Sequence, residues 1–265
     1  AHAAARAYAD RNRPAPGSQE FKDLIEDVRT AQFQRNPPGA GFYDNSRLYH
    51  AEFNYNFMNE IDFAEIQIGG NFRRYDLFSD GTVFNESPET GTDFQRIGIN
   101  EFGGYAQIAK TFAEDLKLTA SLRYDKNENF EGQVTPRISL VYSLSDAHNI
   151  RASFQTGFRN PDTQAQFIYF PSSSGTLLGS TEANASRYGV HNGGAWTYES
   201  YLAYRASGGV LAADGTPTGG NSTLLVTADI PYVQPERLKS FEVGYKGIFG
   251  QKLLIDLNGY YTTYT

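Results

Sequence analysis

The chain has 265 residues, no cysteine and a formal net charge of −7 at pH 7. The lack of cysteine excludes disulfides, zinc–cysteine sites and thiol catalysis in this stretch, and an acidic chain without a basic cluster argues against nucleic acid as a partner. Mean hydropathy is −0.50, and no apolar run approaches the roughly 18 residues of a spanning helix, so any membrane prediction must come from strand periodicity and loop lengths.

Residues 1–48 lack the two-residue period of a strand. The run from Ser18 to Gln34 instead places apolar residues at helical spacing, and Ser18 is a suitable N-cap. The apolar positions are Phe21, Leu24, Ile25, Val28 and Phe33. We expect an extracellular loop region with a short helix that packs this stripe on other loops, in preference to a ligand-binding role.

Six segments between residues 49 and 160 alternate apolar and polar residues, and two more follow in residues 238–265. The clearest segment, Leu116 to Asp125, places its apolar residues at even positions and polar residues such as Thr119, Arg123 and Asp125 at odd ones. A period of two predicts a strand with two unlike faces. The other segments are Tyr49–Phe57, Ala64–Phe72, Phe102–Ile108, Arg137–Leu144, Ile150–Arg159, Phe241–Lys246 and Leu253–Tyr261.

The connections between these segments alternate in length. Residues 58–62, 113–115, 145–147 and 248–251 form short turns, whereas residues 76–100, 126–133 and 160–237 form long loops. In an up-and-down meander this pattern places all short turns at one rim and all long loops at the other, as in outer-membrane barrels. A soluble sandwich also alternates along its strands, but it has no reason to sort its loops.

We therefore predict an all-β fold, an antiparallel up-and-down transmembrane β-barrel. Eight strands would form a partial wall of a larger barrel of about 22 strands. Its apolar face would contact outer-membrane lipid and its polar face an enclosed interior.

The loop of residues 161–237 is too long for an ordinary connection. It interleaves glycines with aromatic residues, among them Tyr169, Trp196 and Tyr198. Aromatic side chains in an exposed loop are typical of a binding surface, although they could equally pack a small core within the loop. Both interpretations remain open on the sequence alone.

No catalytic motif is recognisable, and the four histidines lack metal-ligand spacing, so we predict no enzyme, no metal site and no cofactor. The better candidates for cargo contact are polar inward positions near the long-loop rim. These residues could instead hydrogen-bond across strands or to a plug. The inward positions are Arg73, Glu101, Arg123, Asp125, Arg137 and Arg159, and with the loop aromatics Tyr169, Trp196 and Tyr198 they make up the predicted site.

Three stretches resemble a known family. Thr135–Leu144 (TPRISLVYSL) and Asn149–Pro161 (NIRASFQTGFRNP) resemble paired barrel strands of TonB-dependent outer-membrane receptors, and Val233–Gly247 (VQPERLKSFEVGYKG) resembles a later segment of the same family. The opening 48 residues look like loop sequence of bacteroidete-type members.

This resemblance implies energised import of a scarce nutrient across the bacterial outer membrane. It implies a plug domain inside the barrel and coupling to the TonB complex through that missing N-terminal region. A surface lipoprotein is a further candidate partner, and the sequence does not decide whether one covers the loops. The chain opens without an initiator methionine and stops within a strand pattern at Tyr260–Thr265, so we expect a truncated piece of the wall. The rival hypotheses are a soluble all-β carbohydrate-binding or adhesion protein, and an outer-membrane scaffold barrel in a larger envelope complex.

Overall fold

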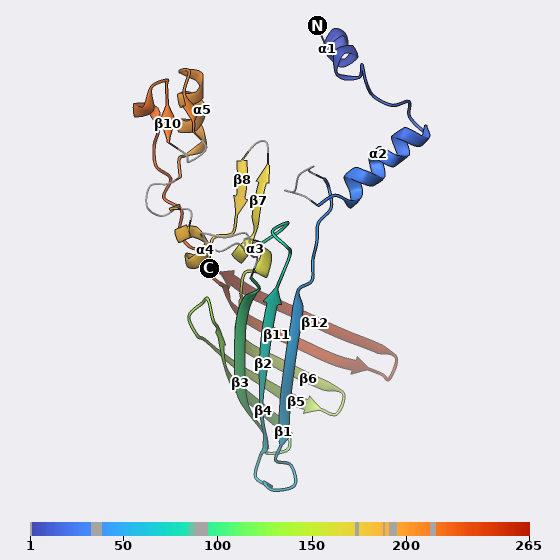
Figure 1. Cartoon of the computed structure of the whole chain (residues 1–265). Helices are drawn as coiled ribbons and strands as arrows, with labels where there is room; N and C mark the ends of the chain where they lie inside the picture. The colour runs from blue at the N-terminus through green and yellow to red at the C-terminus, as the bar shows by residue number, and fades with distance from the viewer. Residues whose placement is uncertain are drawn as a thin grey trace.

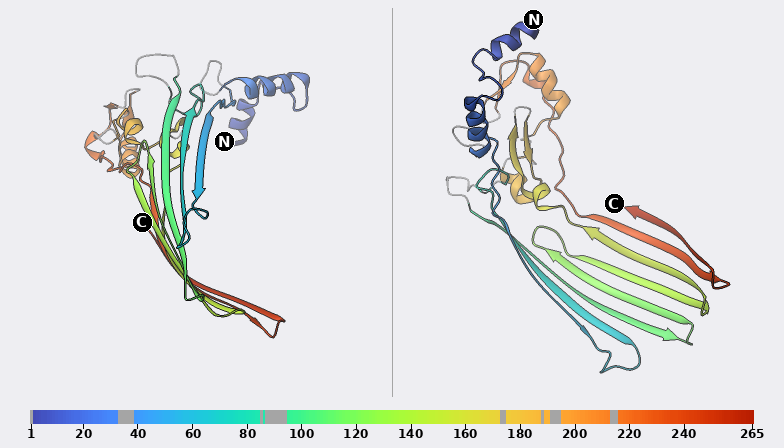
Figure 2. Two further views of the ribbon diagram at one scale, coloured as in Figure 1. Left: turned by 90° about the horizontal axis from the view of Figure 1, so that it is seen from below. Right: turned by 90° about the vertical axis from the view of Figure 1, so that its right-hand side faces the viewer.

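The computed structural model describes residues 2–32, 39–84, 86, 95–172, 175–187, 189–190, 195–212 and 216–265. Its main feature is one curved wall of eight antiparallel strands, with helices and small hairpins gathered beyond one rim (Figure 1, Figure 2). The predicted all-β meander is confirmed. In wall order the strands are β1 (Arg47–Asn56), β2 (Glu65–Leu77), β3 (Ile97–Phe112), β4 (Leu116–Asn127), β5 (Gln133–Ser145), β6 (His148–Arg159), β11 (Glu236–Phe249) and β12 (Leu253–Tyr264).

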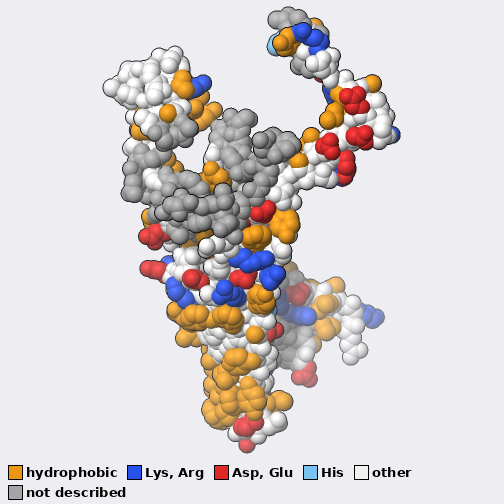
Figure 3. Space-filling view, in the orientation of Figure 1, with side chains coloured by type: hydrophobic (Ala, Val, Ile, Leu, Met, Phe, Trp, Pro, Cys, Tyr) orange, Lys and Arg blue, Asp and Glu red, His pale blue; other side chains and the backbone are white. Residues whose placement is uncertain are grey.

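The strand register joins the alternating faces into two continuous surfaces. Residues paired directly across an antiparallel sheet point to the same face. One such row is aliphatic or aromatic from β2 to β12, and it consists of Ile66, Ile108, Ala120, Ile138, Phe154, Phe241 and Tyr261. A row on the opposite face contains Arg73, Glu101 and Asn127. We call these the apolar face and the polar face. Figure 3 shows hydrophobic side chains covering the lower part of the wall, with charged side chains gathered above them.

The connections sort largely as predicted. Residues 57–64, 113–115, 146–147 and 250–252 join strands at one rim, which we call the short-turn rim, and residues 78–96, 128–132 and 160–235 join them at the other, the long-loop rim. Ala113 and Glu114 both have positive φ, as do Gly250 and Gln251, which suits the twist of tight hairpins. The expectation of a long loop at residues 126–133 is wrong, because β4 and β5 extend into it and leave only residues 128–132.

Two helices precede the wall, α1 (His2–Ala9) and α2 (Gln19–Thr30). Ser18 caps α2 as predicted, since the Phe21 N–H donates to its Oγ at 3.2 Å. The expected packing of the α2 stripe is wrong for the described residues, because α2 projects away from the wall and none of its residues is buried (Figure 1). Phe33 lies outside the described residues. No helix in the described part of the chain is long and apolar enough to cross a membrane.

The connection of residues 160–235 folds partly onto the wall. An apolar cluster of Leu77, Ile99, Phe84 and Phe167 is buried where this connection meets the loop after β2. Phe84 bridges to Ile168, and the Tyr169 N–H donates to the Val83 carbonyl at 2.9 Å. The elements of the connection are α3 (Thr163–Phe167), β7 (Tyr169–Ser172), β8 (Gly175–Leu178), α4 (Glu182–Arg187), α5 (Tyr198–Ala206), β9 (Val210–Leu211), β10 (Pro217–Thr218) and a 3-10 turn, η1 (Ser222–Leu224).

Candidate functional site

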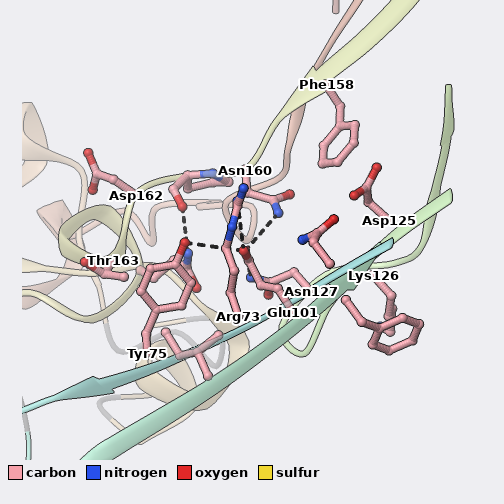
Figure 4. A pocket seen from close by; sticks show the side chains of 15 residues that line it. Arg73, Tyr75, Glu101, Asp125, Lys126, Asn127, Phe158, Asn160, Asp162 and Thr163 are labelled. Atoms are coloured by element: carbon pink, nitrogen blue, oxygen red, sulfur yellow. Dashed lines mark hydrogen bonds and ion pairs between the residues drawn. The ribbon is translucent and has the colours of Figure 1, made fainter. Parts of the chain in front are cut away.

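A pocket of about 440 Å³ lies at the long-loop rim, between the polar face of the wall and the start of the long connection (Figure 4). The meander brings the ends of β2, β3 and β4 together there, and α3 closes the side opposite to them. Its polar lining consists of Asn71, Arg73, Tyr75, Glu101, Asp125, Lys126 and Asn127 from the strands, and Asn160, Asp162, Thr163 and Gln166 from the connection.

The carboxylate of Glu101 is the centre of the pocket's hydrogen-bond network. Asn127 Nδ2 donates to it at 2.6 Å and the Tyr75 hydroxyl at 3.4 Å, while Arg73 Nη1 lies 3.8 Å away. Asn160, the first residue of the connection, also donates to this carboxylate through Nδ2 at 3.5 Å. The Glu101 side chain is only 17% exposed, and a carboxylate so shielded is stabilised by several donors. Glu101 therefore ties the long connection to three strands.

A second network lies beside the first on the same face. Arg123 donates to Asp125 through Nε at 2.7 Å and to Asn71 Oδ1 through Nη2 at 2.6 Å. Gly103 lies between these residues in the register, and a Cβ there would meet Asp125 Oδ1 and Arg123 Nη2. The missing side chain of Gly103 is what allows Arg123 to reach across β3 to β2.

The connection is held over the pocket by its own capping bonds. Asp162 caps α3, since the Ala165 N–H donates to its Oδ1 at 2.6 Å, and Gln166 Nε2 donates to the Pro161 carbonyl at 2.6 Å. Asn129 Nδ2 donates to Gln166 Oε1 at 2.8 Å. Within the described residues, Asn160 Oδ1 is buried without a hydrogen-bond partner. The pocket thus combines fixed donors, carboxylates and one unsatisfied acceptor.

The structure brings together only part of the predicted set. Arg73 and Asp125 line the pocket, and Arg123 fixes Asp125 from beside it. Arg159 lines a neighbouring pocket of about 250 Å³ on the other side of Asn160. Arg137 lies lower on the polar face, paired with Gln155.

The loop aromatics lie away from the pocket lining. Tyr169 belongs to β7, Trp196 bridges to Thr227, and Tyr198 begins α5 with an exposed side chain. The sequence analysis did not predict Tyr75, Asn127 or Asn160 as site residues. Tyr75 and Asn127 were missed because β2 and β4 extend further than their alternation indicated. Asn160 stands in the motif NIRASFQTGFRNP, which was the available signal for it. Within the described residues, no group of three histidine, aspartate or glutamate side chains is placed to hold a metal ion.

Comparison with known proteins decides the family. The family described as "TonB dependent receptor-like, beta-barrel" matches residues 5–265. The chain belongs to this family. The membership places the wall in the bacterial outer membrane and confirms the resemblance of Thr135–Pro161 and Val233–Gly247 to this family. The family relatives found are transporters and receptors rather than enzymes.

Individual members of the TonB-dependent receptor family share only part of their length with the chain. The vitamin B12 transporter BtuB of Vibrio cholerae is 31% identical over 100 residues, which cover 37% of this chain and 16% of BtuB. A variant of the ferric enterobactin receptor PfeA from Pseudomonas aeruginosa aligns with a TM-score of 0.52 at 16% identity, covering 88% of this chain and 28% of PfeA. The siderophore receptor PirA from Pseudomonas aeruginosa aligns with a TM-score of 0.49 at 13% identity, covering 83% of this chain and 33% of PirA. PfeA supports the fold alone.

Proposed function

We propose that the chain forms part of the wall of an outer-membrane receptor that binds a scarce nutrient and imports it with TonB-derived energy. The observation that supports this best is the pocket around Glu101. It opens on the polar face at the long-loop rim, and its lining is shared between wall strands and a connection long enough to move. A site of this composition can bind cargo at the rim and respond to it.

The proposal includes an orientation and a division of the chain. Residues 1–48 and 161–237 form extracellular loops, and residues 49–160 and 238–265 cross the membrane, as the short turns and long loops of such barrels favour. The plug would fill the interior and meet lumenal ion pairs such as Arg151 with Glu242 and Asp256, which lie 3.7 and 3.2 Å apart. A subfamily of bacteroidete type and a surface lipoprotein over the loops belong to the same proposal.

We propose that cargo is contacted by Arg73, Arg123, Asp125, Arg159, Tyr169, Trp196 and Tyr198. The guanidinium and carboxylate groups would meet polar groups of the cargo, and the aromatic side chains would cover its apolar or conjugated parts. Relatives named for vitamin B12 and for ferric enterobactin make these two compounds the first cargo probes.

Growth of the host under nutrient limitation tests this proposal. A strain lacking the full-length gene should lose growth when iron is supplied only as a ferric siderophore or when cobalamin is limiting, and a strain lacking TonB should show the same loss. Glu101→Ala in the full-length receptor should impair growth, whereas Arg151→Ala, a lumenal change away from the pocket, should impair it less. Normal growth of the gene deletion under both limitations would contradict import of either nutrient.

Normal growth of the strain that lacks TonB under the same nutrient limitation would contradict energised import. Stable, monodisperse full-length protein in detergent-free buffer would favour the soluble carbohydrate-binding alternative instead. The continuous apolar row across the wall is the reason that we expect a detergent requirement.

A further inference from the structure

The apolar face changes character toward the long-loop rim. On β11 the apolar-face residues Tyr245, Val243 and Phe241 are followed by Lys239 and then Arg237. On three other strands a cation also follows the apolar residues of this face toward the long-loop rim. These cations are Arg47 on β1, Arg74 on β2 and Lys126 on β4. The apolar face therefore ends in a belt that carries cations on β1, β2, β4 and β11 and the carboxylate of Asp76 on β2, at the level where lipid headgroups begin.

The cations of β11 differ from their counterparts on β2 and β4. Arg74 is paired with Asp76 at 3.1 Å, and Lys126 donates to the Phe130 carbonyl at 2.5 Å. Arg237 and Lys239 are exposed, and their side chains form no ion pair within the described residues. Two neighbouring cations on one face are thus left to bind an anion from outside the chain.

The backbone pairing between β5 and β6 ends next to these two cations. The ladder between β5 and β6 stops at Arg137 and Gln155, although β5 begins at Gln133 and β6 continues to Arg159. The Pro136 carbonyl accepts a hydrogen bond from the Thr156 hydroxyl at 3.4 Å, so this edge of Pro136 faces β6. Proline has no N–H to donate on that edge, and a ladder bond is lost.

A groove of about 630 Å³ lies at this opening. Apolar side chains of β5 and β6 line it together with both cations of β11, and Gln133, Thr135, Thr156, Thr263 and Thr265 complete its polar lining. Since residues 134, 136, 156, 158, 237 and 239 lie on the apolar face of a membrane wall, the groove opens toward lipid. On the apolar face its lining includes Val134, Pro136, Phe158, Arg237 and Lys239, while Leu238 closes it from the polar face. Phe158 also lines the pocket around Glu101.

We propose that this groove binds a membrane lipid whose acyl chain fills the opening between β5 and β6, while Arg237 and Lys239 hold its headgroup phosphate. A guanidinium and an ammonium are suited to bind a phosphate together, and a hydrocarbon chain suits apolar side chains beside an interrupted ladder. The bound chain would seal the wall where backbone pairing stops. This inference depends on the outer-membrane location and not on the cargo proposed above.

Native mass spectrometry of the full-length receptor tests the proposal, with diphosphorylated lipid A as the probe and its dephosphorylated form as the comparison. The double variant Arg237→Gln/Lys239→Gln should bind lipid A about tenfold more weakly. The dephosphorylated lipid should bind the unmodified receptor about tenfold more weakly as well. Lys110→Gln is the matched control, because Lys110 lies on the same face near the short-turn rim, with its Nζ 5.6 Å from the Phe112 ring centroid.

A second variant tests the opening itself. Pro136→Val restores an N–H on the edge facing β6, so the ladder should extend, the groove should narrow and lipid affinity should fall while both cations remain. Heat-modifiable migration on gels would verify that each variant is folded. Unchanged lipid affinity of the double variant would overturn the proposal, as would an equal loss in Lys110→Gln. Displacement of lipid A by inorganic phosphate at the same concentration would identify a phosphate site without an acyl subsite and would also overturn it.

Discussion

Arg123 and Asp125 form a two-bond ion pair on the polar face of β4, with Arg123 Nε 2.7 Å from Asp125 Oδ2 and Nη2 2.5 Å from Oδ1. The same guanidinium bonds to Asn71 on β2, across the bare backbone of Gly103 on β3. One side chain on β4 therefore links β4 to β2 across the intervening strand β3, beside the candidate pocket.

Removing this guanidinium should weaken the wall locally. Arg123→Ala leaves the Asp125 carboxylate, which is 17% exposed, without its strongest donor. We expect a loss of about 1 kcal/mol in the free energy of unfolding, since the guanidinium itself is partly exposed and screened. Denaturant unfolding of the full-length receptor in lipid vesicles measures it. Arg137→Ala on the same face is the control, and an equal or greater loss there would contradict the bridging role of Arg123.

Phe167 should anchor α3 to the wall. Its side chain is buried against Leu77, Phe84 and Ile99, and truncation of a buried phenylalanine costs about 3–5 kcal/mol. In Phe167→Ala the connection should detach while the strands remain paired. Hydrogen exchange of residues 160–170 should therefore rise, with little change in residues 116–125. Uniform loss of protection across both segments would show that α3 is not a separable cap.

The contacts of Phe167 with Leu77 and Ile99 could not be predicted from the sequence, unlike the strands themselves. The alternation of Leu116 to Asp125 was sufficient to predict β4 and its two faces, because residues two positions apart in a strand point to the same face of the sheet. Near the long-loop rim, Leu77 and Ile99 are apolar on the polar face, which breaks the pattern, so their strands were predicted to end earlier.

The residues that cover Leu77 and Ile99 could not be identified from periodicity. Phe84 and Phe167 come from two different connections, and no local pattern relates them. The pocket depends on the same convergence, since Asn160 and Glu101 meet only when the long connection folds back. Arg73 and Asp125 were predicted because they lie within regular strands, whereas Tyr75 and Asn127 lie at strand ends that the pattern did not reach.

Glu86 should make the loop after β2 sensitive to pH. Burial raises the pKa of its carboxyl above the usual value near 4.5, although the Gly81 N–H donates to it at 2.8 Å and the Ser79 N–H also donates to it. A group whose pKa is raised on folding stabilises the fold most below its unfolded pKa, and this contribution is lost as pH rises through the folded pKa.

The loop should accordingly be best protected in acid. Hydrogen exchange of residues 78–84, corrected for the intrinsic rate, should show less protection at about pH 8 than at about pH 5. Glu86→Gln should abolish most of this difference, because an amide does not titrate in the range. Protection that increases with pH in the unmodified protein would contradict a raised pKa for Glu86.

The two faces of β5 should tolerate charge unequally. Ile138 lies in the middle of the apolar row, between Ala120 and Phe154, whereas Ser139 pairs with Thr119 on the polar face. Ile138→Arg should cost about 2–4 kcal/mol because the charge enters hydrocarbon, and Ser139→Arg should cost far less. Folding equilibria in lipid vesicles compare the two directly. Equal costs would mean that the faces are assigned wrongly.

The most direct test of the membrane wall is a scan of single spin labels along β4, residues 116–125, in the full-length receptor reconstituted in a bilayer. These 265 residues contain no cysteine, so within this stretch an introduced cysteine at each label position has no native cysteine to compete with it. Labels at 116, 118, 120, 122 and 124 should collide with dissolved oxygen and be shielded from a water-soluble nickel chelate. Labels at the odd positions should show little oxygen contact. Oxygen accessibility without a two-residue period, or a period with the odd positions in lipid, would contradict the account.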